Sequence, residues 1–363
     1  SAPGAVTVTP RDDSRRKRPT LEAVARRAFV AKSTASRALR GDLRIAADTR
    51  RRVTEVALEL GYDPLVAAPR SGVAGIVSAS GMDDSFSDPF HMDIVSGIAE
   101  GLSTMGMGLL FVPRAGAPGH DDVVSRIPLD VCFLLHGFST YSSTRASLER
   151  RGIPVLVIEA EPGDPAPTVV TNERQAYRDL MDMLYAAGHR GVGVVSLPIS
   201  HHRPNRGFVE LSDFSTVEVI PTRDRLEVMA AAGLRAEAIF ETTRSLEDEG
   251  ELAAQAFLAR PTLPTAIVCH SDVLAVGVVT ALRDAGVRIP EDVSVTGFDG
   301  LDIPLLAPLV LATVFQDGYE KGRLLADEAR RLLTGAPLHQ AELYMTARVG
   351  TSVGPPRRGQ ATR

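Results

Sequence analysis

The chain has 363 residues, of which 44% are hydrophobic, and its net charge is −5. This length is sufficient for two or three domains, and the hydrophobic share supports buried cores. No apolar run approaches the ~20 residues needed to span a bilayer, and the N-terminus lacks a signal-peptide pattern, so we expect a cytoplasmic protein that does not enter membranes.

The charge is unevenly distributed along the chain. Residues 1–72 hold 15 Lys/Arg against 8 Asp/Glu, a net charge of +7, and the remainder therefore carries −12. This asymmetry is expected when only one end of a protein meets nucleic-acid phosphates. Cys132 and Cys269 each lie inside an apolar run, and we interpret both as buried free thiols in a reducing compartment.

The N-terminal segment, residues 1–18, lacks apolar periodicity and ends in a run of cations, which predicts a disordered basic arm. Residues 19–63 then have the pattern of three short helices separated by tight breaks. Thr20 is a suitable cap for the first helix, the second spans 32–39, and Asp48 opens the third. The apolar faces of these helices are so narrow that they can bury a core only against each other.

The outer faces of the three predicted helices are strongly basic, which indicates either a solvated surface or a DNA-binding surface. The spacing favours a helix-turn-helix module whose second helix enters a major groove. On that helix Arg37 suits a bidentate contact with guanine, and Lys32 and Ser33 lie near its start.

The segments TLEAVARRA, KSTASRALRG and ADTRRRVTEVALELGYDP resemble the DNA-binding headpiece of the lactose-repressor (LacI/GalR) family. The resemblance implies that Lys32, Ser33 and Arg37 read bases. It also implies that a second set of polar residues lies near phosphates: Thr20, Thr34, Ser36, Arg44 and Thr49. Phe29 stands where the family usually has glycine. Serine caps are replaced by alanine at two helix starts, and each missing cap costs on the order of 1 kcal/mol.

Residues 64–73 are expected to link the headpiece to the rest of the chain. This segment resembles the hinge of the same family, which becomes helical on DNA and inserts a leucine into the minor groove. Here the wedge position falls at Ser71, and Pro69 stands where the hinge would be helical. Proline in a helix interior costs about 3 kcal/mol, so the usual hinge mechanism is not expected.

From residue 74 to residue 353, apolar strand-like runs alternate with amphipathic helices, which predicts buried parallel sheets. The predicted strands are 74–80, 108–113, 130–137, 154–160, 191–197, 236–241, 265–270 and 293–299. The predicted helices are 92–105, 144–151, 173–187, 223–232, 246–258, 272–285 and 316–333. This order predicts an α/β fold with two doubly wound subdomains behind the headpiece.

The stretches DPFHMDIVSGIAEGL, PTAIVCHSDVLAVGVVTALRDAG and VRIPEDVSVTGFD resemble the type I periplasmic-binding-protein-like effector and dimerisation domain of the same family. The resemblance implies that residues 74–353 form two subdomains, each built from two separate segments of the chain. The N-subdomain would hold about 74–171 and 317–338, and the C-subdomain about 172–316 and 339–353. Residues 354–363 are expected to be a flexible tail.

Ligands of open α/β sheets bind beyond the C-terminal ends of the strands. This rule selects four candidate effector-binding residues: His136, Glu159, Ser271 and Asp299. Asp272 also follows a strand, but it opens a helix, so it either caps that helix or contacts the ligand.

The family resemblance adds three further effector-binding residues. Arg225 takes the place of an arginine that binds effector hydroxyls or carboxylates, and Gln316 matches a position between the subdomains. Phe90 is either a stacking platform for the ligand or a core aromatic. Carboxylates and a guanidinium together suit a polyhydroxylated molecule, although the chain has no tryptophan to stack on a sugar ring.

These features predict a transcriptional regulator, most simply a repressor, that binds a palindromic operator as a homodimer and responds to a sugar or other polar metabolite. A regulator without a sugar effector is one alternative. A doubly wound enzyme is another, but its phosphate-binding and nucleophile motifs are missing from the sequence. A plain solute-binding protein would not need the headpiece. No cofactor and no metal site are expected.

Overall fold

The computed structural model describes residues 20–39, 42, 44–60, 62, 71–78, 86–112, 124–135, 142–158, 169–200 and 204–357. Contacts divide the chain into two compact units, Ser1–Pro69 and Arg70–Arg363, which are treated separately below. The predicted basic arm, residues 64–70 of the linker and the last six residues of the predicted tail lie outside the described residues.

The first unit contains the three predicted helices, α1 (Leu21–Arg27), α2 (Lys32–Leu39) and α3 (Ala47–Leu60). Thr20 caps α1, because its hydroxyl oxygen accepts a hydrogen bond from the Ala23 amide at 3.2 Å. The buried side chains come from all three helices and are nearly all alanine or valine: Val24, Ala25, Ala28, Ala35, Ala38, Val53, Val56, Ala57 and Tyr62. A core of such small side chains buries little apolar area, so the headpiece is sensitive to single substitutions.

Phe29 occupies the turn between α1 and α2 with a positive φ of 54°, and its side chain is 90% exposed. A left-handed backbone costs a bulky residue about 1–2 kcal/mol, whereas glycine adopts it freely. We therefore expect Phe29→Gly to stabilise the headpiece by roughly 1 kcal/mol, after the larger unfolded-state entropy of glycine is allowed for. Hydrogen exchange of the α1 and α3 amides in the full chain measures this change. Unchanged or faster exchange would show that the exposed ring has a stabilising contact.

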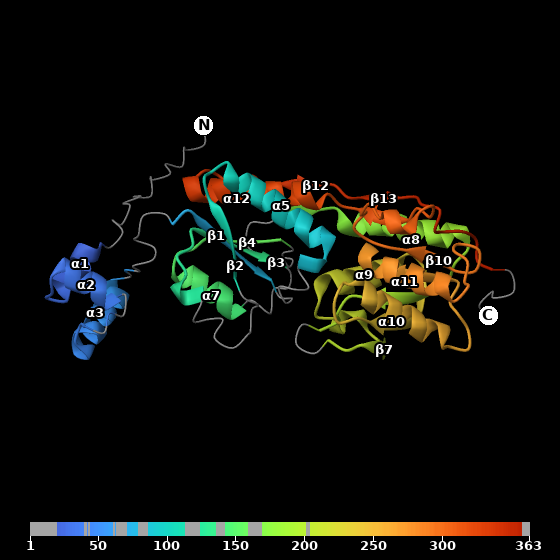
Figure 1. Cartoon of the computed structure of the whole chain (residues 1–363), viewed down its shortest axis with the longest axis horizontal. Helices are drawn as coiled ribbons and strands as arrows, with labels where there is room; N and C mark the ends of the chain where they lie inside the picture. Colours follow the sequence, from blue (N-terminus) through green and yellow to red (C-terminus); the bar gives the residue numbers. More distant parts are fainter. Residues whose placement is uncertain are drawn as a thin grey trace, which may run out of the picture. The chain divides into compact units, whose positions relative to one another are not determined.

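The second unit contains two parallel sheets, each flanked by helices (Figure 1). The first sheet has the order β2-β1-β3-β4, and all of its pairs are parallel. Its elements are β1 (Val73–Ser78), α5 (Pro89–Ser103), β2 (Gly108–Val112), β3 (Val131–Leu135), α7 (Ser142–Arg150) and β4 (Val155–Val157). The helix α12 (Gly318–Thr334) returns from the other sheet and packs beside α5 (Figure 1).

The second sheet has the order β10-β9-β6-β8-β7, with only the edge strand β7 antiparallel among its described pairs. Its strands are β6 (Gly191–Ser196), β7 (Gly207–Val209), β8 (Arg235–Glu241), β9 (Ala266–Cys269) and β10 (Ser294–Thr296). The helices of this half are α8 (Glu173–Ala187), α9 (Ile220–Ala231), α10 (Glu247–Leu258) and α11 (Asp272–Asp284), with short 3-10 turns at η2 (Phe214–Thr216) and η3 (Pro304–Leu306). Both predicted doubly wound sheets are therefore confirmed.

Four short strands connect the two halves or extend their sheets. β5 (Val170–Thr171) pairs with β12 (Glu342–Leu343), and β11 (Thr313–Phe315) pairs with β13 (Thr346–Arg348). Beyond β13, the Val295 amide donates to the Ser352 carbonyl at 2.9 Å, so the C-terminal segment is fixed to the second sheet.

Glycines bring two pairs of helices into close backbone contact. A Cβ on Gly97 of α5 would lie 2.0 Å from the Tyr319 carbonyl oxygen of α12, and one on Gly322 would lie 2.1 Å from the Ile94 carbonyl oxygen. The same arrangement recurs between α10 and α11, where a Cβ on Gly277 would lie 1.9 Å from the Glu247 carbonyl oxygen. In each half, two helices are thus packed more closely than any side chain allows.

Cys132 and Cys269 are buried free thiols, as predicted. Burial raises the pKa of the Cys132 thiol to about 12. Among the described residues, no helix is long and apolar enough to cross a membrane, and no group of three or more His, Cys, Asp or Glu side chains is placed to hold a metal ion.

Candidate functional site

The predicted DNA-binding surface is built on α2. Ala35 and Ala38 face the headpiece core, which turns the opposite side of the helix outward. Lys32 and Ser33 are exposed at its first turn, and Arg37 is partly exposed one turn later. The three residues expected to read bases therefore share the side of α2 that is not used for folding.

Asp42 links Arg37 of α2 to Arg44, which lies beyond the end of this helix. Its Oδ2 accepts a hydrogen bond from Nε of Arg37 at 2.9 Å and from Nη2 of Arg44 at 2.9 Å, and its Oδ1 accepts from Nε of Arg44 at 3.0 Å. Hydrogen bonds from Arg44 and Arg37 hold the pKa of the Asp42 carboxyl below its usual range, and Asp42 raises the pKa of Arg44. Sequence reasoning missed this carboxylate, although an acidic residue inside a basic module was visible.

The residues expected near phosphates are distributed over all three helices and the loop before α3. Thr34 and Ser36 lie on α2, Thr49 lies in the first turn of α3, and Arg44 is exposed between these helices. The Thr20 hydroxyl oxygen caps α1, so it already has a role in the fold. It also lies at the start of this helix, where backbone amides favour a nearby anion. These positions are compatible with a phosphate-contacting rim, whose role stays a prediction.

At the end of the linker, Ser71 is tied to the second unit. Its amide and hydroxyl donate to Oδ1 of Asp130 at 2.9 and 3.1 Å, and the Gly72 amide donates to Oδ2 at 2.8 Å. Ser71, which aligns with the minor-groove wedge of the family, is therefore held by hydrogen bonds to Asp130, the residue before β3.

Arg225 of α9 lies at the C-terminal edge of the second sheet and is only 5% exposed. Its Nε donates to Oε1 of Glu173 at 3.1 Å, its Nη1 donates to the His270 carbonyl at 2.5 Å, and its guanidinium lies 3.6 Å from the centre of the Phe298 ring. Glu173 opens α8 and was not among the predicted residues. Its carboxylate balances the charge of Arg225 within the site.

Asp299 and Gln316, two of the predicted effector-binding residues, come from separate segments and are in direct contact. Nε2 of Gln316 donates to Oδ1 of Asp299 at 2.7 Å, and both side chains are buried. Asp299 has a positive φ of 116°, which is strained for a residue with a side chain, and backbone hydrogen bonds to Val314 and Gln316 hold it there. Such strain commonly marks a functional position.

Burial raises the pKa of the Asp299 carboxyl well above its usual value, and repulsion from Asp272 and Asp88 adds to this effect. Asp88 caps α5 of the other half, where its Oδ1 accepts from the Phe90 amide at 3.0 Å. The charge of Asp88 therefore acts on Asp299 across the two halves. Asp88 was overlooked in the sequence, although it belongs to the DPF segment that drew attention to Phe90.

Ser271, and not Asp272, caps α11, which corrects the capping alternative considered for Asp272. The Ser271 hydroxyl accepts from the Leu274 amide at 3.1 Å. Asp272 instead joins three segments, because it accepts from the Thr313 hydroxyl at 2.7 Å and from the Leu301 amide at 2.8 Å. Burial outweighs these hydrogen bonds and raises the pKa of Asp272 to about 7.

The remaining candidates are placed as follows. Phe90 is 5% exposed and packs within the core beneath α5 and α12, which favours the core-aromatic alternative over a stacking platform. His136 and Glu159 lie outside the described residues.

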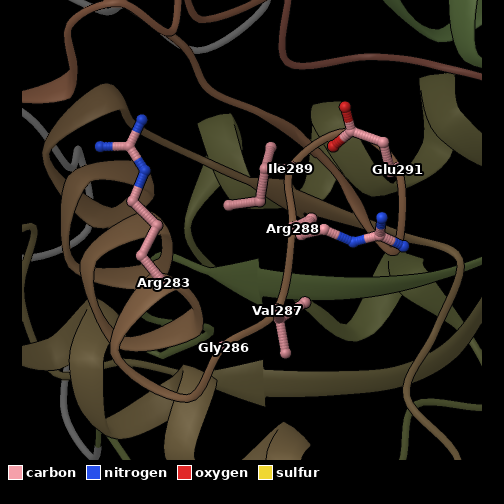
Figure 2. A pocket seen from close by; sticks show the side chains of 6 residues that line it. All are labelled: Arg283, Gly286, Val287, Arg288, Ile289 and Glu291. Carbon is pink, nitrogen blue, oxygen red and sulfur yellow. The ribbon is translucent and has the colours of Figure 1, made fainter.

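A surface hollow of about 460 Å³ follows α11, away from the predicted site residues (Figure 2). Its lining comes from one segment: Arg283, Gly286, Val287, Arg288, Ile289 and Glu291. The two guanidinium groups point away from each other (Figure 2), Arg283 donates to the Leu306 carbonyl at 2.9 Å, and Arg288 pairs with Asp292 at 2.8 Å. Both arginines are thus used within the fold.

The three-helix headpiece and the paired parallel sheets together define a DNA-binding regulator class, and comparison with known proteins agrees. The family model described as "Bacterial regulatory proteins, lacI family" matches residues 20–64. The model described as "Periplasmic binding protein-like domain" matches residues 181–353. An HTH-type transcriptional regulator of Mycobacterium tuberculosis is 30% identical over 94% of this chain and 98% of its own length. The HTH-type transcriptional repressor CytR of Escherichia coli is 29% identical over 90% and 95%. The chain belongs to the lacI family of transcriptional regulators, which are not enzymes.

Solved structures share the fold along most of the chain. A lacI-family regulator of Corynebacterium glutamicum has a TM-score of 0.69 at 22% identity and covers 93% of this chain and all of its own. The CelR–cellobiose complex has a TM-score of 0.63 at 24% identity, covering 92% and 100%. The lac repressor dimer bound to operator and the anti-inducer ONPF has a TM-score of 0.63 at 19% identity, covering 93% and 100%.

Proposed function

We propose that this regulator is a repressor that binds a palindromic operator as a homodimer. A small polar molecule that binds the second unit changes the affinity of the repressor for its operator, lowering it for an inducer and raising it for a co-repressor. The observation that carries the proposal is the outward face of α2, where Lys32, Ser33 and Arg37 lie opposite the alanines of the core. A helix of this kind reads base edges in the major groove. Operator binding would place the protein in the cytoplasm.

The homodimer is supported by symmetry and by exposed apolar side chains. A two-fold operator requires two headpieces, and a two-fold dimer supplies them. In the second unit Leu305 of η3 is 65% exposed and Val310 is 56% exposed. The related lac repressor structure is a dimer on its operator. We place the domain boundaries as the family resemblance does: headpiece 19–63, linker 64–73 and effector domain 74–353.

The effector proposed for this site is a neutral, polyhydroxylated molecule. Glu173 balances the charge of Arg225, and the raised pKa of Asp299 favours its uncharged acid form. Together with the Gln316 amide, these groups offer both hydrogen-bond donors and acceptors, which suits hydroxyls. The related CelR structure holds cellobiose. Effector binding acts on DNA affinity only if it favours one arrangement of the two halves.

The test is salt-dependent binding of the full chain to a family-like palindromic duplex and to a scrambled duplex. We expect Arg37→Ala to weaken operator binding by about 1–3 kcal/mol and to change binding of the scrambled duplex little. Fluorescence anisotropy at several salt concentrations measures both affinities.

Arg52→Ala is the matched control, because it removes one exposed cation from α3 and leaves α2 intact. We expect it to weaken both duplexes about equally. If Arg37→Ala also weakens both duplexes equally, the headpiece is only a basic surface and the proposal fails. If Arg37→Ala weakens binding of the operator duplex alone, sugars and nucleosides are then screened for a shift in operator affinity.

A further inference from the structure

The carboxylate of Asp42, which lies beyond the end of α2, contacts Arg37. Besides the 2.9 Å contact from Nε of Arg37 to Oδ2, the Asp42 amide donates to the Arg37 carbonyl at 3.1 Å. We propose that Asp42 is a positioning residue that holds Arg37 in the conformation that reads a guanine. This inference rests on the proposed function, in which Arg37 contacts operator bases.

The geometry of the contact leaves the reading groups of Arg37 available. A guanidinium has five N–H donors, and the contact from Nε uses one of them. The terminal Nη1 and Nη2 groups keep the paired donors that a guanine requires at O6 and N7. The Arg37 side chain is 39% exposed, so the contact with Asp42 leaves it partly accessible.

Asp42 is itself fixed in place. The Arg44 amide donates to its Oδ1 at 3.0 Å, and the Arg44 side chain adds contacts to both carboxylate oxygens. The Asp42 side chain is only 17% exposed, although it lies on a small headpiece. An oriented carboxylate restricts the rotamers of a flexible arginine before binding, which lowers the entropy lost when the arginine meets its base.

This role predicts a change in specificity and not only in affinity. Removing an anion from the headpiece strengthens contact with any phosphate, so overall binding is an ambiguous measure. Releasing Arg37 from its support lowers the discrimination between a guanine and another base at one position. A general loss of folded headpiece would weaken all duplexes by the same factor and leave this ratio unchanged.

The experiment uses the full chain and a duplex that the wild-type protein selects from a random palindromic library. In each half-site, single guanines are replaced by adenine or by 7-deazaguanine, which lacks the N7 acceptor. The discrimination ratio is the affinity for the selected duplex divided by that for the substituted duplex. It is measured for wild type, Arg37→Ala, Asp42→Ala, Asp42→Asn and Asp48→Ala.

Asp48→Ala is the matched control, because it removes another carboxylate of the headpiece, one that pairs with Arg51 of α3 at 2.6 Å. Asp42→Asn keeps an oxygen to accept the Arg44 amide and so preserves the turn. We expect the ratio at the guanine read by Arg37 to fall on the order of tenfold in both Asp42 variants. In Asp48→Ala it stays at the wild-type value.

Three outcomes would overturn the inference. If Arg37→Ala removes the discrimination but both Asp42 variants keep it, Arg37 reads the base without help, and only the role of Asp42 is wrong. If Arg37→Ala leaves the discrimination intact, the proposed reading by Arg37 fails as well. If the Asp42 variants discriminate more strongly than wild type, the carboxylate competes with DNA for Arg37.

Discussion

Replacing Gly277 with alanine is expected to lower the free energy of unfolding of the second unit by about 3 kcal/mol or more. The added Cβ would lie 1.9 Å from the Glu247 carbonyl oxygen and 2.7 Å from the Glu251 amide nitrogen. These are backbone atoms, which cannot turn aside as a side chain does, so α10 and α11 must separate. The loss exceeds the gain of about 1 kcal/mol that alanine brings to a helix interior. Urea denaturation followed by far-UV circular dichroism measures the difference.

Gly108 provides the control for this substitution. A Cβ at Gly108 meets nothing within 4 Å, and the residue begins the strand β2. Gly108→Ala is therefore expected to change stability by no more than about 0.5 kcal/mol. Equal effects of the two substitutions would mean that α10 and α11 separate easily, against the close packing described above.

Asp272→Asn is expected to change how stability depends on pH. The pKa of Asp272 is raised to about 7 in the folded protein, whereas an unfolded aspartate titrates near 3.9. Between these values the folded state binds more protons than the unfolded state, so this residue makes the protein less stable as pH rises. Relative to wild type, the Asn variant should gain roughly 2–3 kcal/mol between pH 5 and pH 8.

The slope, and not the absolute stability, is the measured quantity in this experiment. Asparagine keeps one acceptor for the Thr313 hydroxyl but loses the contact with the Leu301 amide, a cost that does not depend on pH. Asp179→Asn, which alters an exposed carboxylate on α8, is expected to follow the wild-type profile. Parallel profiles for wild type and Asp272→Asn would show that Asp272 stays ionised when buried.

The strands were predictable because buried parallel strands are written as continuous apolar runs. Each of the eight predicted runs overlaps an observed strand. Three helices begin earlier than predicted, α5 at Pro89, α7 at Ser142 and α9 at Ile220. In α5 and α9 a proline lies in the first helical turn, where its fixed φ and missing N–H are tolerated. The two-residue strands β5 and β12 are too short to produce any periodic pattern.

The candidate site was only partly predictable, for a related reason. The strand-end rule selected Asp299, and a family position selected Gln316. In the fold Nε2 of Gln316 lies 2.7 Å from Oδ1 of Asp299. Glu173 and Asp42 could not be chosen in this way, because their importance comes from the arginines they contact. Arg225 is 52 residues from Glu173 along the chain, and no local pattern records such a pair.

The packing of α12 against α5 also determines the order in which this protein can be completed on the ribosome. Leu325 and Ala329 of α12 and Ala341 beyond it close the core that begins at Ala74. The other core needs Met345, and His189 contacts the Gly354 carbonyl at 2.9 Å. Neither half can therefore finish folding before residues 341–354 have been synthesised, so both expose apolar surface to chaperones until then, while the headpiece core is complete once Tyr62 has been made.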